Sequence, residues 1–188
     1  DEWLYLGYAQ WIAENVQALP TLFTELANPA EPTIRILPML WMAIDASWLG
    51  ESSVGWALVT LFGHGGVSYL VTRLGVRLGI ASGGANLAGL IFFIHPVTCE
   101  ALLWQSAGRE VVMMSGLLLL ALCAHLDRRW WLASIAFAAA LLSREHALGF
   151  LLLAPLCDWR IGDRLRYRAY LGYLLAIVVP MFLWRAWL

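Results

Sequence analysis

The sequence predicts an all-α protein, a polytopic transmembrane helix bundle. Of its 188 residues 61% are apolar and only 13% are charged, which lies outside the composition of soluble globular domains. Apolar runs recur along the chain between Arg, Gly and Pro residues, as they do where helices cross a bilayer repeatedly. All 12 basic residues are Arg, and the net charge of −1 gives no surplus for binding polyanions. We therefore expect no nucleic acid partner.

Residues 1–53 are expected to form an extracytoplasmic loop that carries membrane-surface helices. From Trp3 to Leu19, apolar residues alternate with Gln, Glu and Asn, a pattern typical of an amphipathic helix too polar to span a membrane. We expect this helix to lie parallel to the membrane with Trp11 and Leu19 turned to lipid. Prolines then break the chain. We expect a second membrane-surface helix from Ile34 to Leu49, because Pro38 and Asp45 interrupt the apolar run there.

Residues 54–188 are expected to form the transmembrane module, because a spanning helix needs about 20 mostly apolar residues. Six candidate membrane helices appear: Val54 to Thr72, Ile80 to Val97, Val111 to Leu126, Trp130 to Ser143, His146 to Trp159 and Ala169 to Leu188. The fourth and fifth are short, which predicts two helices that meet at a polar break around Arg144 and Glu145, within the membrane. We expect this break to lie close to the loop from His95 to Arg109.

The distribution of Arg residues predicts how the chain is oriented. With this helix layout, eight Arg fall in loops on one side, which the positive-inside rule makes cytoplasmic. Ten of the 13 acidic residues and only four Arg fall on the other side or near it. Arg73, Arg128 and Arg164 are therefore expected on one face, and Asp1, Glu100 and Arg109 on the opposite face.

The two ends of the chain bear on its completeness. Asp1-Glu2-Trp3 does not resemble the start of a secretory signal, and the apolar run from Ala169 ends at Leu188 without a polar tail. We therefore expect a fragment, or the ordered part, of a longer protein.

Polar residues are expected to converge on the extracytoplasmic side. They are Asp1-Glu2, Arg35, the stretch from His95 to Glu110, and Ser143 to His146. Ionisable side chains at membrane depth are costly unless they are paired or solvated, so a cluster of them often marks a substrate path. Carboxylates can bind a divalent cation or accept a proton, and Arg binds phosphate oxygens. The alternative is that Arg109, Glu110, Arg144 and Glu145 only neutralise one another between helices.

Two motifs make the chain similar to a known superfamily. HPVTCEALLWQSAGRE, followed about thirty residues later by LLSREHALGFLLLAPLCDW, resembles the pattern of bacterial GT-C glycosyltransferases. The likeness is greatest to the membrane part of tetratricopeptide-containing O-mannosyltransferase-like proteins, and it is most specific from Ile91 to Trp159. It implies a GT-C-like fold in the bacterial inner membrane. The implied activity is transfer of a sugar from a polyprenyl-phosphate carrier to an extracytoplasmic acceptor.

The resemblance also implies roles for individual residues. Asp1 would be the catalytic base, with Glu2 and Glu100 beside it, and Asp1 and Glu100 would hold a divalent metal ion if one is used. Arg109, Arg144 and Arg35 would bind the lipid phosphate. His95, Glu110 and Glu145 would support these groups. The partners implied are the polyprenyl-phosphate lipid, membrane lipids and other membrane subunits.

Two other functions stay open from the sequence. The chain could be a non-catalytic scaffold subunit of a larger membrane complex with a degenerate GT-C-like fold. Alternatively, His64, which lies among glycines within an apolar run, could be an axial ligand of a haem or pigment. A histidine in this setting more often bonds between closely packed helices.

Overall fold

All regular secondary structure in the described part of the chain is helical. This computed structural model describes residues 2–23, 35–50, 52–96, 105–163 and 166–187, and no strand occurs among them. The elements are α1 (Glu2–Glu14), the 3-10 helix η1 (Val16–Phe23), α2 (Ile36–Leu49), α3 (Ser53–Arg77), α4 (Ser82–Ile94), α6 (Gln105–Leu126), α7 (Trp130–Ser143), the 3-10 helix η2 (Glu145–Gly149), α8 (Phe150–Arg160), α9 (Tyr167–Tyr173), the π-helix η3 (Leu174–Val178) and α10 (Val179–Trp187). The predicted all-α class is confirmed.

Three segments of the described chain are long and apolar enough to cross a membrane. They are Ser53–Arg77, Gly108–Leu126 and Tyr167–Trp184, the last formed by α9, η3 and α10 in succession. Three of the six predicted membrane helices thus have spanning length.

The second predicted membrane helix, Ile80 to Val97, is shorter than expected. Helix α4 has 13 residues, which at about 1.5 Å per residue cover about 20 Å of a roughly 30 Å hydrocarbon core. It ends because His95 adopts an extended conformation (φ −66°, ψ 130°), as is favoured before a proline such as Pro96. The sequence criterion counted apolar residues and overlooked this helix-ending dipeptide.

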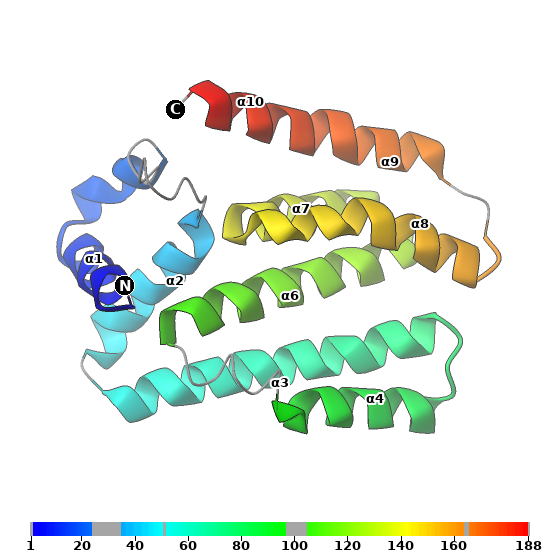
Figure 1. Cartoon of the computed structure of the whole chain (residues 1–188), viewed down its shortest axis with the longest axis horizontal. Helices are drawn as coiled ribbons and strands as arrows, with labels where there is room; N and C mark the ends of the chain where they lie inside the picture. The colour runs from blue at the N-terminus through cyan, green and yellow to red at the C-terminus, as the bar shows by residue number, and fades with distance from the viewer. Residues whose placement is uncertain (1, 24–34, 51, 97–104, 164–165, 188) are drawn as a thin grey trace.

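The helices from α3 onwards run back and forth along one common direction (Figure 1). This places the connections after α3, α6 and α8 together at one end of the bundle, which we call the Arg-rich end. Arg77–Asp127, Arg128–Asp163 and Arg166–Asp163 pair there. Arg109, near the start of α6, lies at the opposite end, where α1 and α2 pack (Figure 1). The described Arg residues therefore separate as predicted, whereas Asp1, Glu100 and Arg164 lie outside the described residues.

Helices α1 and α2 lie across this second end, which we call the N-terminal end (Figure 1). Ala9 and Ile12 of α1 are buried in a cluster with residues of α2 and with Trp56 of α3. Trp11 is 44% exposed, and its orientation toward lipid stays a prediction. Leu19, which was expected to face lipid, instead packs against this cluster.

Small residues bring α3 and α4 into close contact. The α-hydrogens of Gly89 face Thr72 and Ser68 so closely that a Cβ atom there would lie 2.1 Å from Thr72 Oγ1 and 2.9 Å from the Ser68 carbonyl oxygen. Further along, a Cβ at Gly75 would meet Ala85 at 3.2 Å. This close approach is typical of helix pairs in membranes, where small residues let backbones pack directly.

Candidate functional site

A buried ion pair joins α2 to α6 at the N-terminal end. Arg109 is fully buried, and its Nε donates a hydrogen bond of 3.0 Å to Asp45 Oδ2. Its Nη2 donates to the Trp56 carbonyl oxygen at 3.1 Å, and the guanidinium lies 4.3 Å from the centre of the Trp56 ring. Burial raises the pKa of Asp45, and the positive charge of Arg109 partly opposes that rise.

A second ion pair lies next to it and includes two predicted site residues. Arg35, just before α2, donates from Nη1 to Glu110 Oε1 at 2.9 Å. Glu110 is 1% exposed, and Arg144 and Glu145 lie within electrostatic range of its carboxylate. The structure thus brings together four residues that the sequence placed on one face: Arg35, Glu110, Arg144 and Glu145.

The break between the two short helices occurs where it was predicted. Helix α7 ends at Ser143, and Arg144 has extended backbone angles (φ −164°, ψ 139°) before η2 begins at Glu145. The Arg144 amide donates to the Ala140 carbonyl oxygen of α7 at 2.9 Å, and the Arg144 carbonyl oxygen accepts from the Ala147 amide of η2 at 3.1 Å, so Arg144 links the two helices through its backbone. Arg144 and Glu145 are therefore presented at a helix junction beside Glu110.

Of the remaining predicted site residues, the structure describes only some. His95 is exposed and lies just after α4. Asp1, Glu100 and the side chain of Glu2 lie outside the described residues. Within the described ranges no three His, Cys, Asp or Glu side chains gather as metal ligands. A metal ion at Asp1 and Glu100 therefore stays a prediction.

Asp45 is a functional candidate that the sequence analysis missed. It was noted only as an interruption of an apolar helix, yet its carboxylate forms an ion pair with Arg109 at 3.0 Å. An acidic residue in an otherwise apolar run was the available signal, because such a residue requires a partner. Its partner is 64 positions away in sequence, so only helix packing reveals the pair.

The Arg-rich end contains a second buried polar network that was not predicted. His125 at the end of α6 lies 3.1 Å from the Tyr173 hydroxyl through Nδ1 and 3.2 Å from Asp158 Oδ2 through Nε2. Asp158 also accepts a hydrogen bond from the Tyr170 hydroxyl and lies 3.2 Å from Arg166 Nη1. These residues connect α6 and α8 to α9, so the network fixes the last membrane segment to the bundle.

His64 occupies a packed position between α3 and α4. It is 2% exposed, and its Nε2 lies 3.2 Å from the Phe93 carbonyl oxygen. The imidazole stacks on Phe92 and Phe93 with ring centres 5.4 and 5.5 Å apart. This arrangement matches bonding between helices, and a haem or pigment would have to displace both rings and the hydrogen bond.

Comparisons of the chain with models of protein families, with curated proteins and with solved structures find no match.

Proposed function

We propose that this chain is the membrane module of a GT-C-type glycosyltransferase that transfers a sugar from a polyprenyl-phosphate carrier to an extracytoplasmic acceptor. The observation that carries the proposal is the junction of α7 and η2, where Arg144 and Glu145 lie beside the Arg35–Glu110 pair. Charged groups gathered at one end of an apolar bundle often mark a substrate path.

In this proposal Arg144 binds a phosphate oxygen of the lipid carrier, with Arg35 beside it. A guanidinium suits this role because it binds phosphate oxygens through paired N–H donors. The acceptor hydroxyl attacks the anomeric carbon, its proton passes to a carboxylate, assigned to Asp1, and the polyprenyl phosphate leaves with the electrons of the broken C–O bond. Arg109 has a positioning role, since its guanidinium holds Asp45 of α2 against α6.

A scaffold subunit is the competing function, and one observation favours it. Arg109 is fully buried and is bound by Asp45 and by the Trp56 carbonyl oxygen, so this Arg stabilises the fold without any ligand. If Arg144 likewise served only to balance Glu110 and Glu145, the same cluster would be purely structural.

Transfer measurements on the whole protein in membranes separate the two functions. The probe is polyprenyl-phosphate mannose with a labelled sugar, and the readout is label transferred to membrane acceptors. Arg144→Ala and Asp1→Ala are each expected to abolish transfer while the protein remains inserted and folded. Arg73→Ala is the matched control, because Arg73 is an exposed Arg near the opposite end of the bundle. Normal transfer by both test variants would leave the scaffold function.

A further inference from the structure

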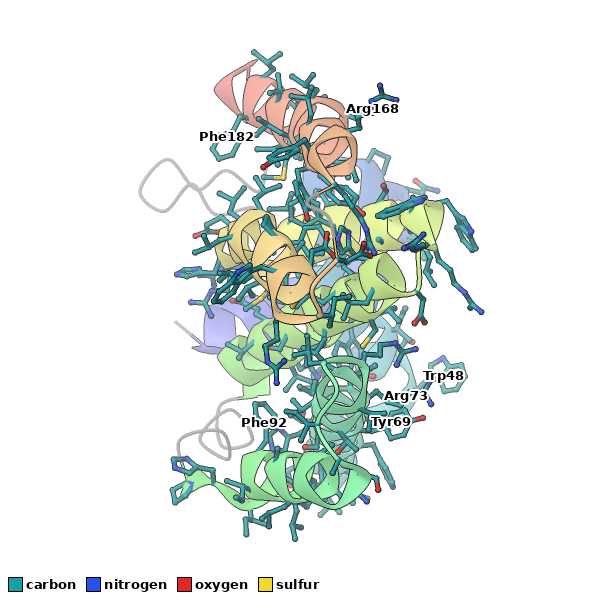
Figure 2. The ribbon with its side chains drawn as sticks, turned by 90° about the vertical axis from the view of Figure 1, so that its right-hand side faces the viewer. Trp48, Tyr69, Arg73, Phe92, Arg168 and Phe182 are labelled. Carbon is teal, nitrogen blue, oxygen red and sulfur yellow. The ribbon has the colours of Figure 1, made fainter. Side chains whose placement is uncertain are left out.

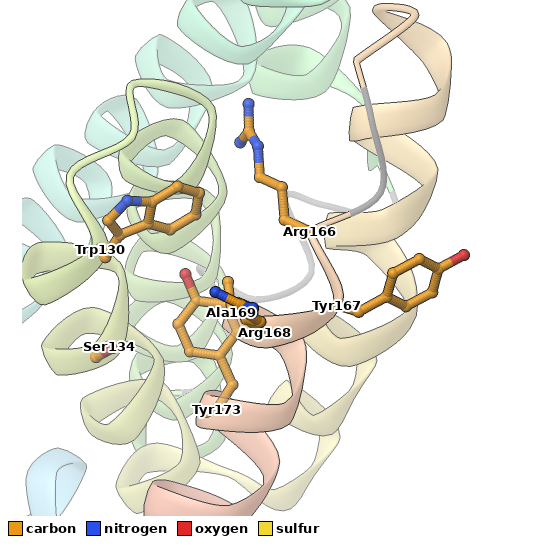
Figure 3. A pocket seen from close by; sticks show the side chains of 8 residues that line it. Trp130, Ser134, Arg166, Tyr167, Arg168, Ala169 and Tyr173 are labelled. Carbon is orange, nitrogen blue, oxygen red and sulfur yellow. The ribbon is translucent and has the colours of Figure 1, made fainter.

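A pocket of about 730 Å³ opens at the Arg-rich end between α7 and α9 (Figure 3). Trp130 and Ser134 of α7 form one wall, and Arg166, Arg168, Gly172 and Tyr173 form the other. The pocket lies next to the buried His125–Asp158 network, since Arg166 and Tyr173 belong to both. It is far from Arg144, which lies at the other end of α7.

The two guanidinium groups of the pocket differ in how they are held. Arg166 is fixed by Asp158 and Asp163, and it lies 5.1 Å from the centre of the Trp130 ring. Arg168 is exposed and projects from the edge of the molecule (Figure 2). It forms no salt bridge with another described residue. The pocket therefore has a positive charge at its rim that is available to an anion.

The rest of the pocket suits an apolar chain. Ala169 and Gly172 are three residues apart on one face of the helix, and Tyr173, which is 3% exposed, lies beside them on the side toward the core. No described atom lies within 4 Å of the position that a Cβ would take at Gly172, which leaves room along this face. Beyond it the same segment continues with apolar side chains such as Leu175, which is 56% exposed.

A cationic rim above an apolar helix face matches a molecule with an anionic phosphate and a long hydrocarbon chain. Aromatic residues support this placement, because Trp130 and Tyr167 at the pocket are residue types that prefer the membrane–water interface. Basic pockets between membrane helices bind anionic lipid headgroups for these reasons. A soluble phosphate would use the rim but would leave the apolar face uncovered.

We propose that this pocket binds one anionic phospholipid, with its phosphate at Arg168 and an acyl chain along α9 past Ala169 and Gly172. The bound lipid fills the space between α7 and α9 and thereby stabilises the docking of the last membrane segment. The proposal is independent of the glycosyltransferase function, because the two sites lie at opposite ends of the bundle.

The test is native mass spectrometry of the whole protein in detergent with phosphatidylglycerol or phosphatidylcholine of identical acyl chains. The wild type is expected to retain phosphatidylglycerol preferentially. Arg168→Ala and Arg168→Gln should each weaken that binding about fivefold, the effect expected of one Arg at a membrane surface. Arg160→Ala is the control, since Arg160 is exposed at the same end and does not line the pocket; it should change binding less than twofold. Gly172→Leu should weaken binding by filling the chain-binding face.

Several results would overturn the proposal. Equal retention of the two lipids would remove the role of the negative charge. An equal loss in Arg160→Ala and Arg168→Ala would show general surface attraction, and unchanged binding in Gly172→Leu would remove the acyl-chain site. Inorganic phosphate that displaces phosphatidylglycerol at equal concentration would assign the rim to a soluble anion. Each variant is first checked for the wild-type unfolding temperature in phosphatidylcholine nanodiscs. If Arg168→Ala unfolds early, Arg168→Gln replaces it, and if Gly172→Leu unfolds early, Gly172→Met replaces it.

Discussion

Substituting Gly89 by Ala tests the close contact between α3 and α4. The added Cβ would lie 2.1 Å from Thr72 Oγ1 and 2.9 Å from the Ser68 carbonyl oxygen. The Thr72 side chain can rotate, but the Ser68 carbonyl belongs to the backbone of α3, so the helices must separate. Overpacking of this kind costs about 1–3 kcal/mol, whereas Gly to Ala within a helix gains up to about 1 kcal/mol. We expect a net loss of about 1–2 kcal/mol in the free energy of unfolding.

The assay is reversible unfolding of the purified protein in mixed detergent micelles, followed by helical circular dichroism. The matched control is Gly66→Ala in α3, because no described atom lies within 4 Å of its Cβ position; this variant should be as stable as the wild type or more stable. Adding Thr72→Ala to Gly89→Ala removes the nearer contact and should recover part of the loss. Equal stability of Gly89→Ala and Gly66→Ala would refute the close packing of α3 and α4.

Three further predictions concern the ion pairs. Asp45→Ala should lower the free energy of unfolding by about 3–5 kcal/mol because it removes a carboxylate that pairs with the buried Arg109. Asp45→Leu combined with Arg109→Met should recover most of that loss in the same unfolding assay. Asp158→Ala should likewise lower the free energy of unfolding by about 3 kcal/mol and should expose α9 to proteolysis before the rest of the bundle. Cleavage of α9 at the same rate in this variant and in the wild type would contradict this. The guanidinium of Arg77 lowers the pKa of Asp127. The stabilisation from this pair is therefore fully present above the ordinary Asp pKa of about 3.9 and is lost as the pH falls through the lowered value. The stability difference between the wild type and Arg77→Ala should shrink below about pH 4, and a difference that grew on acidification would contradict the pairing of Arg77 with Asp127.

Composition and local pattern were enough to determine the class of the fold and the positions of most helix ends. The apolar runs predicted helices, and the Arg-rich connections predicted which ends of those helices lie together. The break at Arg144 followed from two apolar runs of only 14 residues on either side of a charged pair. Because Arg35, Glu110, Arg144 and Glu145 all lie at helix ends on the same side, their gathering needed only the order of the helices along the chain.

The pairs inside the bundle were decided only by the tertiary structure. Asp45 and Arg109 are 64 positions apart, and His125 lies 33 and 48 positions from Asp158 and Tyr173. Each pair depends on how far two helices are rotated about their axes and shifted along each other, which is set by the side chains packed along their interface. Periodicity in the sequence identifies the face on which a residue lies, but the partner across an interface is determined by the summed packing of all the helices.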